Sequence, residues 1–285
     1  QVMSLIKDKA SLLRQGYEGR RGKITDEGIV IWPSKNKRVV FSPEMSISYQ
    51  MKLRPDMVVV LDDFTMPDSG HKEAEETVKR TIMWAKRCKE EFERQCKRLK
   101  LTGKKRPYIL GVVQGGYYED LRVLCTRELI KIGFDGLGYG GWPLLKSGKF
   151  DYQTAEIIAK EAPEGYFLYG LGIGKPEDIV GCVKRGWSIF DCVLPSRDAR
   201  HGRLYVWKKG MKVDEKGEFY EFWTPKGRDR LDESPIDETC DCLTCQHYSR
   251  AYLTHLWKLK EMSVGRLFTI HNLRFYSRLM ETLRD

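Results

Sequence analysis

The sequence contains no long hydrophobic run: nowhere do about 18 apolar residues follow one another, so we expect no membrane-spanning helix. It also shows no leader with a charged start and an apolar centre, which leaves nothing that marks it for export. A regular disulfide spacing is absent from its eight cysteines, as is typical of a reducing compartment. These absences predict a soluble, cytoplasmic protein without a membrane partner.

Negative charge is in the minority. The 285 residues include 40 acidic and 50 basic side chains, which gives a formal net charge of +10. An excess of this size suits a polyanionic partner such as nucleic acid. Because many basic proteins bind no nucleic acid, the charge leaves both possibilities open, and local clusters must decide between them.

Cysteine is concentrated at one place, where Cys240, Cys242 and Cys245 lie within six residues and His271 follows 26 residues later. Zinc prefers four such ligands in a tetrahedron, and a tight turn can supply three of them. His271 is favoured as the fourth because it lies where the final helical pattern begins. The rival histidines are His247 and His255. Clustered buried thiols are the alternative. A closed site of this kind leaves no position for substrate, so we expect the metal to be structural.

Short apolar runs alternate with long helical patterns through the middle of the chain. The runs indicate buried strands, and the longer segments carry apolar residues at helical spacing. The predicted strands are Met57–Leu61, Tyr108–Val113, Phe134–Tyr139, Phe167–Leu171 and Ser188–Val193, and the predicted helices are Lys72–Lys100, Tyr118–Ile132, Tyr152–Ala162 and Pro176–Arg185. Repeated βα units predict an α/β fold with a parallel sheet. Five units are fewer than the eight of a closed (β/α)8 barrel, so a doubly wound sheet is the competing architecture.

The segments before and after this region do not show the alternation of strand and helix patterns. Ile24–Phe41 alternates like an inserted hairpin, and Lys208–Glu221 is typical of a polar hairpin. Tyr248–Met262 and His271–Leu283 carry the patterns of two final helices. We therefore predict an N-terminal segment with the hairpin at 1–56, βα units with the active site at 57–207, and a metal-binding subdomain with terminal helices at 208–285.

Polar residues and glycines follow the predicted strands. The carboxyl ends of parallel strands share one edge of a sheet, where such folds bind their ligands. The residues at these ends are Asp62 and Asp63, Gln114, Gly140 and Gly141, and Gly172 to Lys175, while Asp191 lies inside the last strand near its end. Asp62 could instead cap the next helix, and the glycines could be plain turns. Asp191 is harder to dismiss, because burying an unpaired carboxylate costs several kcal/mol.

Three arginines follow Asp191 at three-residue spacing: Arg197, Arg200 and Arg203. Cations beside a candidate catalytic carboxylate favour an anionic backbone held next to the reacting centre. A solvated arginine loop is the alternative.

Taken together, these residues resemble the tRNA-guanine transglycosylases of the bacterial type. The similarity is carried by Phe190–Arg197, Val112–Gly116, Gly133–Gly136, Gly172–Asp178 and the set of three cysteines with His271, and it extends to Gln1–Leu5 and Phe41–Glu44. The resemblance implies a TIM (β/α)8-type barrel with a structural Zn²⁺. It also implies exchange of guanine for a 7-deazaguanine base at the anticodon wobble position of tRNA. A homodimer or heterodimer is expected near the metal, where the apolar residues are Tyr252, Leu253, Leu256 and Trp257.

The same resemblance assigns roles to individual residues. Asp191 would be the nucleophile that forms a covalent aspartyl-ribose intermediate. The base would be held by Asp62, Gln114, Gly140, Gly141, Leu171 and Gly172. The anticodon loop would be held by Gly174, Lys175, Asp178, Ser196, Arg197 and Arg200. Zn²⁺ would be held by Cys240, Cys242, Cys245 and His271.

Three features depart from the family pattern. The family's Asp-Ser-Gly-Gly segment, whose aspartate is a general acid/base, would precede Gln1. We therefore expect a fragment, or a second chain that supplies the segment, and no normal exchange rate from these residues alone. Lys146 stands where bacterial members keep a glutamate that accommodates a cationic base, which predicts a neutral incoming base. Phe64 replaces a small cysteine and is expected to remodel the wall of the purine slot.

Two other functions compete with this reading. One is a non-catalytic tRNA-binding subunit of a heteromeric transglycosylase, and the other is an enzyme that inserts 7-deazaguanine into DNA. A metal-dependent barrel hydrolase that uses Asp62 and Asp63 is disfavoured, because no histidine follows any of the five predicted strands.

Overall fold

The computed structural model describes residues 22–34 and 37–284, so the N-terminal match at Gln1–Leu5 lies outside the described residues. The chain forms two compact units. The first contains the described residues up to 171 together with 185–189, and the second contains 172–184 together with the residues from 190 onward. The predicted division at 56 and 207 stays a prediction.

A five-stranded parallel sheet forms the centre of the α/β region. Its strands are β4 (Met57–Val59), β5 (Tyr108–Val113), β6 (Gly136–Tyr139), β7 (Phe167–Gly170) and β8 (Ile189–Phe190). They lie side by side in the order of the sequence. A doubly wound sheet reverses its strand order at a switch point, whereas a barrel does not. The predicted α/β fold of the barrel type is therefore confirmed, and all five predicted strands are present.

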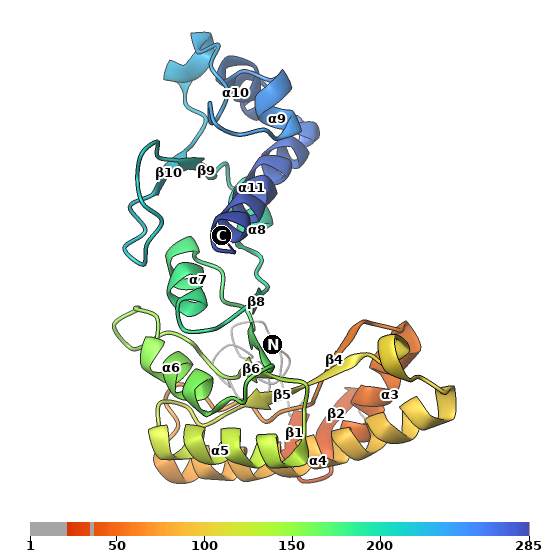
Figure 1. Cartoon of the computed structure of the whole chain (residues 1–285). Helices are drawn as coiled ribbons and strands as arrows, with labels where there is room; N and C mark the ends of the chain where they lie inside the picture. Colours follow the sequence, from red (N-terminus) through yellow and green to blue (C-terminus); the bar gives the residue numbers. More distant parts are fainter. Residues whose placement is uncertain (1–21, 35–36, 285) are drawn as a thin grey trace. The chain divides into compact units, whose positions relative to one another are not determined.

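Three helices of the first unit follow these strands and pack against one another: α4 (His71–Leu99), α5 (Glu119–Ile132) and α6 (Tyr152–Glu161). Figure 1 shows α4 and α5 running side by side below the sheet. The buried positions of α4, such as Val78, Cys88 and Phe92, recur at helical spacing and give it one apolar face. Each helix lies within one or two residues of its predicted bounds.

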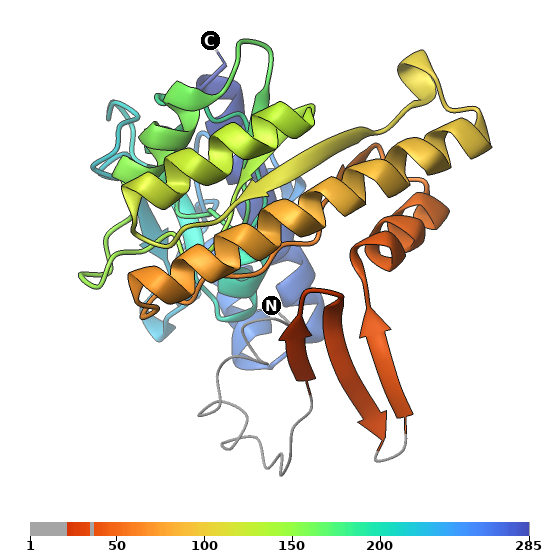
Figure 2. The same ribbon diagram turned by 90° about the horizontal axis from the view of Figure 1, so that it is seen from below.

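The predicted hairpin is part of a larger element, a three-stranded antiparallel sheet of β1 (Gly22–Thr25), β2 (Gly28–Ser34) and β3 (Lys37–Phe41). It is followed by α3 (Pro43–Leu53), and Figure 2 shows the three strands next to α3 and α4. Hydrogen bonds attach the turn between β1 and β2 to α4. The Trp84 indole N–H and the Arg87 guanidinium both donate to the carbonyl of Asp26, at 2.9 Å each.

The second unit contains α7 (Pro176–Val183), α8 (Leu194–Arg200), β9 (Leu204–Trp207), β10 (Tyr220–Trp223), α9 (Leu243–His247), α10 (Arg250–Lys258) and α11 (Met262–Thr282). The polar hairpin predicted at Lys208–Glu221 is wrong in its bounds. The antiparallel pair is β9 with β10, and residues 208–219 connect the two strands.

The final helix begins earlier than predicted, at Met262 instead of His271. Its buried residues Val264 and Phe268 continue the spacing of Phe275 and Leu279 toward the N-terminus, so one apolar face runs along the whole helix. His271 therefore lies in the middle of α11.

A buried amide ties α11 to the rest of the second unit. The Asn272 side chain donates to the carbonyls of Pro195 and Arg203, at 3.0 Å each, and accepts from the N–H of Tyr205 at 3.2 Å. Three backbone groups outside α11 are thus satisfied by one side chain, which fixes α8 and β9 on the helix. None of the described helices combines the length and apolar character that crossing a membrane requires.

Candidate functional site: a polar cluster at the strand ends and a Cys3His group

Gln114 lies fully buried at the carboxyl end of β5, and its amide organises the polar cluster of the first unit. Nε2 donates to Oδ2 of Asp62 at 2.5 Å, and Oε1 accepts from the N–H of Thr65 at 3.1 Å. The backbone donor defines which end of the amide is oxygen, so the nitrogen faces Asp62. One N–H of this nitrogen remains for a further acceptor.

Gly140 and Gly141 follow β6 and pass directly beside the same amide. A β-carbon on Gly140 would lie 2.6 Å from Gln114 Nε2, which no side chain could tolerate. Gly141 has φ +88°, a conformation that glycine adopts without strain. The structure thus brings together Asp62, Gln114, Gly140 and Gly141, as predicted from their positions after neighbouring strands.

The Asp62 carboxyl is half-buried, and burial raises its pKa above the ordinary value. The neighbouring Asp63 carboxylate raises the pKa further, while the Gln114 hydrogen bond opposes both effects. Asp63 itself is fully buried and pairs with Arg80 at 2.5 Å. Asp62 caps no helix, because α4 begins after Gly70.

Leu171 follows β7 directly, and its side chain lies against β6. A β-carbon on Gly138 of β6 would lie 2.9 Å from Cδ1 of Leu171, so the glycine provides the space for the leucine side chain. Phe64 packs in the cluster of Ile29 and Trp84, against β2 and α4.

Asp191 belongs to the second unit and follows β8 directly, so the prediction that it lies inside the last strand is wrong. The side chain is exposed, and the argument from the cost of burial does not apply to it. Its Oδ1 accepts from the N–H of Gly172 at 3.0 Å. Gly172 has φ +72°, and this turn directs its amide at the carboxylate.

The predicted RNA-binding residues differ in their surroundings. Gly174 is buried, its carbonyl accepts from the Tyr276 hydroxyl at 2.7 Å, and a β-carbon there would overlap Cys192. Asp178 is also buried, in the first turn of α7. The cationic side chains Lys175, Arg197 and Arg200 are exposed, whereas Ser196 of α8 is half-buried.

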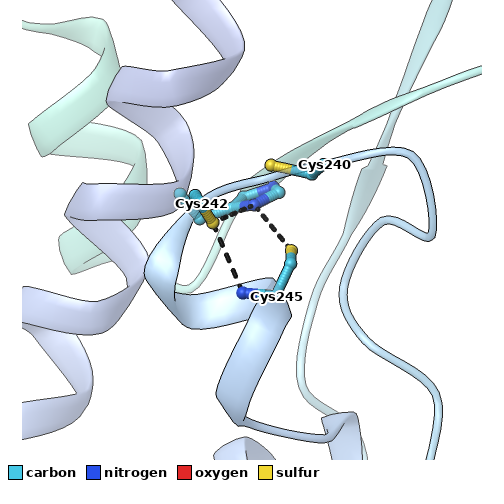
Figure 3. Close-up of side chains that lie close together, drawn as sticks. Cys240, Cys242 and Cys245 are labelled. Atoms are coloured by element: carbon cyan, nitrogen blue, oxygen red, sulfur yellow. Dashed lines mark hydrogen bonds between the residues drawn. The ribbon is translucent and has the colours of Figure 1, made fainter.

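Cys240, Cys242, Cys245 and His271 form a buried group whose ligand atoms all lie within 4.8 Å of one another. Figure 3 shows the three thiols directed toward one small volume. His271 Nδ1 lies 3.3 Å from Cys245 Sγ and 3.7 Å from Cys242 Sγ. The rivals His247 and His255 are exposed and lie outside the group, so the predicted ligand set is the one that converges.

The other ring nitrogen of His271 explains how the group is oriented. Nε2 lies 2.7 Å from the carbonyl oxygen of Tyr205 and donates to it. This bond leaves Nδ1 as the unprotonated nitrogen that faces the thiols. Three thiols and one oriented imidazole are the donor set of a closed structural metal site. Among the described residues this is the one group of at least three potential ligands that converges in this way, so Asp62 and Asp63 form no second metal site there.

Sequence reasoning missed Arg122 of α5, which is fully buried and bonded to the loops that carry Gln114 and Gly140. The signal was available: Arg122 lies on the same helical face as Cys125, Thr126 and Leu129, all buried. A charged residue at a core position of an amphipathic helix requires a partner.

Replacing His271 with alanine or Cys245 with serine should remove the bound metal, because each variant leaves three ligands and an open position. Metal content per chain after gel filtration, measured by mass spectrometry, should fall from about one to near zero. His247→Ala is the matched control and should keep its metal. Full metal content in both ligand variants would refute the site.

Asp62→Asn should raise the melting temperature near neutral pH. A carboxyl whose pKa is raised by folding binds its proton more tightly in the folded state, so its ionised form costs stability above that pKa. The cost disappears as the pH falls below the ordinary value of 3.8, and the gain of the variant should vanish with it. Thermal melts over this pH range test the prediction, with the exposed Asp68→Asn as control. A gain independent of pH contradicts it.

The comparisons with known proteins agree on one family. The sequence profile described as Queuine tRNA-ribosyltransferase matches residues 8–285. A queuine tRNA-ribosyltransferase of Idiomarina loihiensis is 37% identical over 268 residues, which cover 94% of this chain and 66% of the relative. Those of Acinetobacter baylyi and Aliivibrio fischeri are 37% and 38% identical and are covered over 65% and 66% of their lengths. The chain thus spans just under two-thirds of the curated relatives that it matches, and it belongs to the queuine tRNA-ribosyltransferase family.

Proposed function

We propose that the protein exchanges guanine for a 7-deazaguanine base at the wobble position of a tRNA anticodon, through a covalent aspartyl-ribose intermediate. The observation that carries the proposal is the cluster of Asp62, Gln114 and Gly141 at the strand ends of a member of this family. A carboxylate acceptor beside two N–H donors is complementary to the hydrogen-bonding edge of guanine.

In the proposed complex, the Asp62 carboxylate accepts from N1–H and the exocyclic amine of guanine. The second N–H of Gln114 and the N–H of Gly141 donate to O6. Leu171 and Gly172 form the walls of the purine slot. A site built to pair each polar atom of the base rejects bases that leave those atoms unpaired.

Asp191 acts as the nucleophile. One carboxylate oxygen attacks C1′ of the ribose, the bond from C1′ to N9 breaks, and guanine departs with the electron pair. The incoming base then displaces the carboxylate from C1′, so two inversions give net retention, as in retaining glycosidases. The hydrogen bond from Gly172 holds the carboxylate in place for this attack. Exclusion of water makes the outcome exchange instead of hydrolysis.

The exposed cations of the second unit bind the anticodon loop. Lys175 directly precedes α7, and Arg197 and Arg200 lie on α8. These two helices flank Asp191 in the sequence. Guanidinium and ammonium groups hold phosphates, and the target base is extruded from the loop before it reacts. The Cys3His group holds one Zn²⁺ that stabilises the fold of the C-terminal region.

A dimer formed through the metal-binding region would use few of the apolar residues named above. Leu253 is fully buried within the second unit, and Leu256 and Trp257 pack against the same core. Tyr252 is the exposed one of the four, with 47% of its surface accessible. The contact would therefore centre on Tyr252.

The covalent intermediate can be trapped. Incubation of the full-length protein with tRNA and 9-deazaguanine, which fills the base site, should yield an RNA–protein adduct on a denaturing gel. Asp191→Asn should give no adduct, because the amide is a poor nucleophile. Ser196→Ala is a control on the neighbouring helix. An adduct of equal yield with Asp191→Asn would refute the assignment, and tRNA bound without any adduct from the unaltered protein would favour a binding subunit.

The incoming base should be neutral. Lys146 lies exposed in the turn after Gly141 that the Leu145–Lys149 backbone hydrogen bond closes, at 2.8 Å. A cation there repels a base with a protonated aminomethyl group. In competition assays, a nitrile-bearing 7-deazaguanine should be incorporated in preference to the aminomethyl compound, and Lys146→Glu should reverse the order. Preference of the unaltered protein for the cationic base would contradict the prediction.

A further inference from the structure

Arg122 is a fully buried cation that makes all its described hydrogen bonds to backbone carbonyls. Nη1 donates to the carbonyls of Val113 and Gly140, at 2.6 Å and 2.8 Å, and Nε donates to that of Gly116 at 2.8 Å. Within residues 22–34 and 37–284, no carboxylate forms an ion pair with it. Its guanidinium lies over the ring of Tyr139, 5.1 Å from the centroid.

The three carbonyls lie at the end of β5 and in the loops after β5 and β6, which carry part of the polar cluster. Val113 and Gly116 enclose Gln114, and Gly140 precedes Gly141. The side chain of Arg122, on α5, therefore connects the end of β5 to the end of β6. Burying a guanidinium without an anion costs folding free energy, and neutral hydrogen-bond donors could connect the same loops at a lower cost. We therefore expect an effect of the positive charge of Arg122 on the peptide groups that it contacts.

The bond to Gly140 determines where the next amide points. The peptide between Gly140 and Gly141 is trans, because the described residues contain no cis peptide bond. In a trans peptide the C=O and the following N–H point in opposite directions. Since the Gly140 carbonyl is held by Arg122, the Gly141 N–H points away from Arg122. In the described part of the chain this N–H has no acceptor. Gly141 lies beside the Gln114 amide, because a β-carbon on it would be 3.3 Å from Gln114 Oε1.

We infer that Arg122 is a positioning residue for recognition of a 6-oxopurine: it fixes the Gly140–Gly141 peptide so that the Gly141 N–H, together with Gln114, meets the oxygen on C6. A guanidinium on the carbonyl side also polarises the peptide and strengthens its N–H as a donor. The negative charge that builds up on a departing guanine is stabilised by such a donor. This inference rests on the proposed function and adds to it a determinant of base selectivity.

The test compares two free bases that differ at C6. Guanine carries the oxygen and an N1–H, whereas 2-aminopurine has the same exocyclic amine, a hydrogen at C6 and an unprotonated N1. The difference at N1 is the same for every variant, because all of them keep Asp62. Affinities of the full-length protein for both bases are measured by calorimetry or by the fluorescence of 2-aminopurine. Arg122→Met removes the cation and its bonds, and Arg122→Lys keeps a cation with fewer bonds and serves if the methionine variant does not fold. Thr126→Val is the control, because Thr126 is buried on the same helix and bonds to the Arg122 backbone without reaching the loops.

Both Arg122 variants should bind guanine about tenfold more weakly and 2-aminopurine with unchanged affinity, as expected for the loss of one oriented hydrogen bond. Thr126→Val should retain the preference for guanine even if its melting temperature falls as far. An equal loss of both bases would show that Arg122 is only structural and would overturn the inference while the proposed function stands. Failure of the unaltered protein to bind either base would overturn both.

Discussion

The candidate active site depends on a buried amide that forms hydrogen bonds with two neighbours at once. Gln114 has no exposed surface, so its nitrogen and oxygen must find partners within the protein. It finds them in Asp62 and Thr65 after one strand and lies against Gly140 and Gly141 after another. Replacing Gln114 with an apolar residue would leave the half-buried Asp62 carboxylate without its hydrogen-bond donor. The geometry of this polar cluster therefore follows from the packing of three adjacent parallel strands.

The second unit obeys a different constraint, set by α11. Asn272 and Tyr276 of this helix bind backbone groups of α8, β9 and the loop before α7, while His271 faces the cysteines. The same helix thus carries one metal ligand and the hydrogen bonds that fix the segment after Asp191. Binding of a metal at the Cys3His group would stabilise the helix on which that segment rests. A structural metal can in this way support the proposed chemistry without taking part in it.

The parallel strands and the residues at their ends were predictable from the sequence, because buried parallel strands are continuously apolar and end abruptly in polar residues or glycine. The strands at Tyr108–Val113 and Phe167–Gly170 are examples, and the residues that follow them were assigned to the site. The metal ligands were predictable from spacing and chemistry. The predicted place of His271 at the start of the final helix is nonetheless wrong, since it lies in mid-helix. The roles given to Asp62 and Asp191 came from family resemblance, not from the pattern.

Long-range hydrogen bonds were not predictable, because they depend on which segments the fold brings together. Arg122 was overlooked although it occupies a core position, since its partners are carbonyls that no sequence pattern reveals. Asn272 was overlooked for the same reason. The pairing of β2 with both β1 and β3 and the true bounds of β9 and β10 likewise depend on tertiary contacts, which override weak local preferences in short strands.

A crystal structure of the full-length protein with guanine bound tests the central claim most directly. The account predicts a purine whose N1–H and amine face the Asp62 carboxylate, whose O6 accepts from Gln114 and from the N–H of Gly141, and whose N9 points toward Asp191. Guanine bound elsewhere, or bound there with Asp191 beyond reach of a ribose on N9, would contradict it.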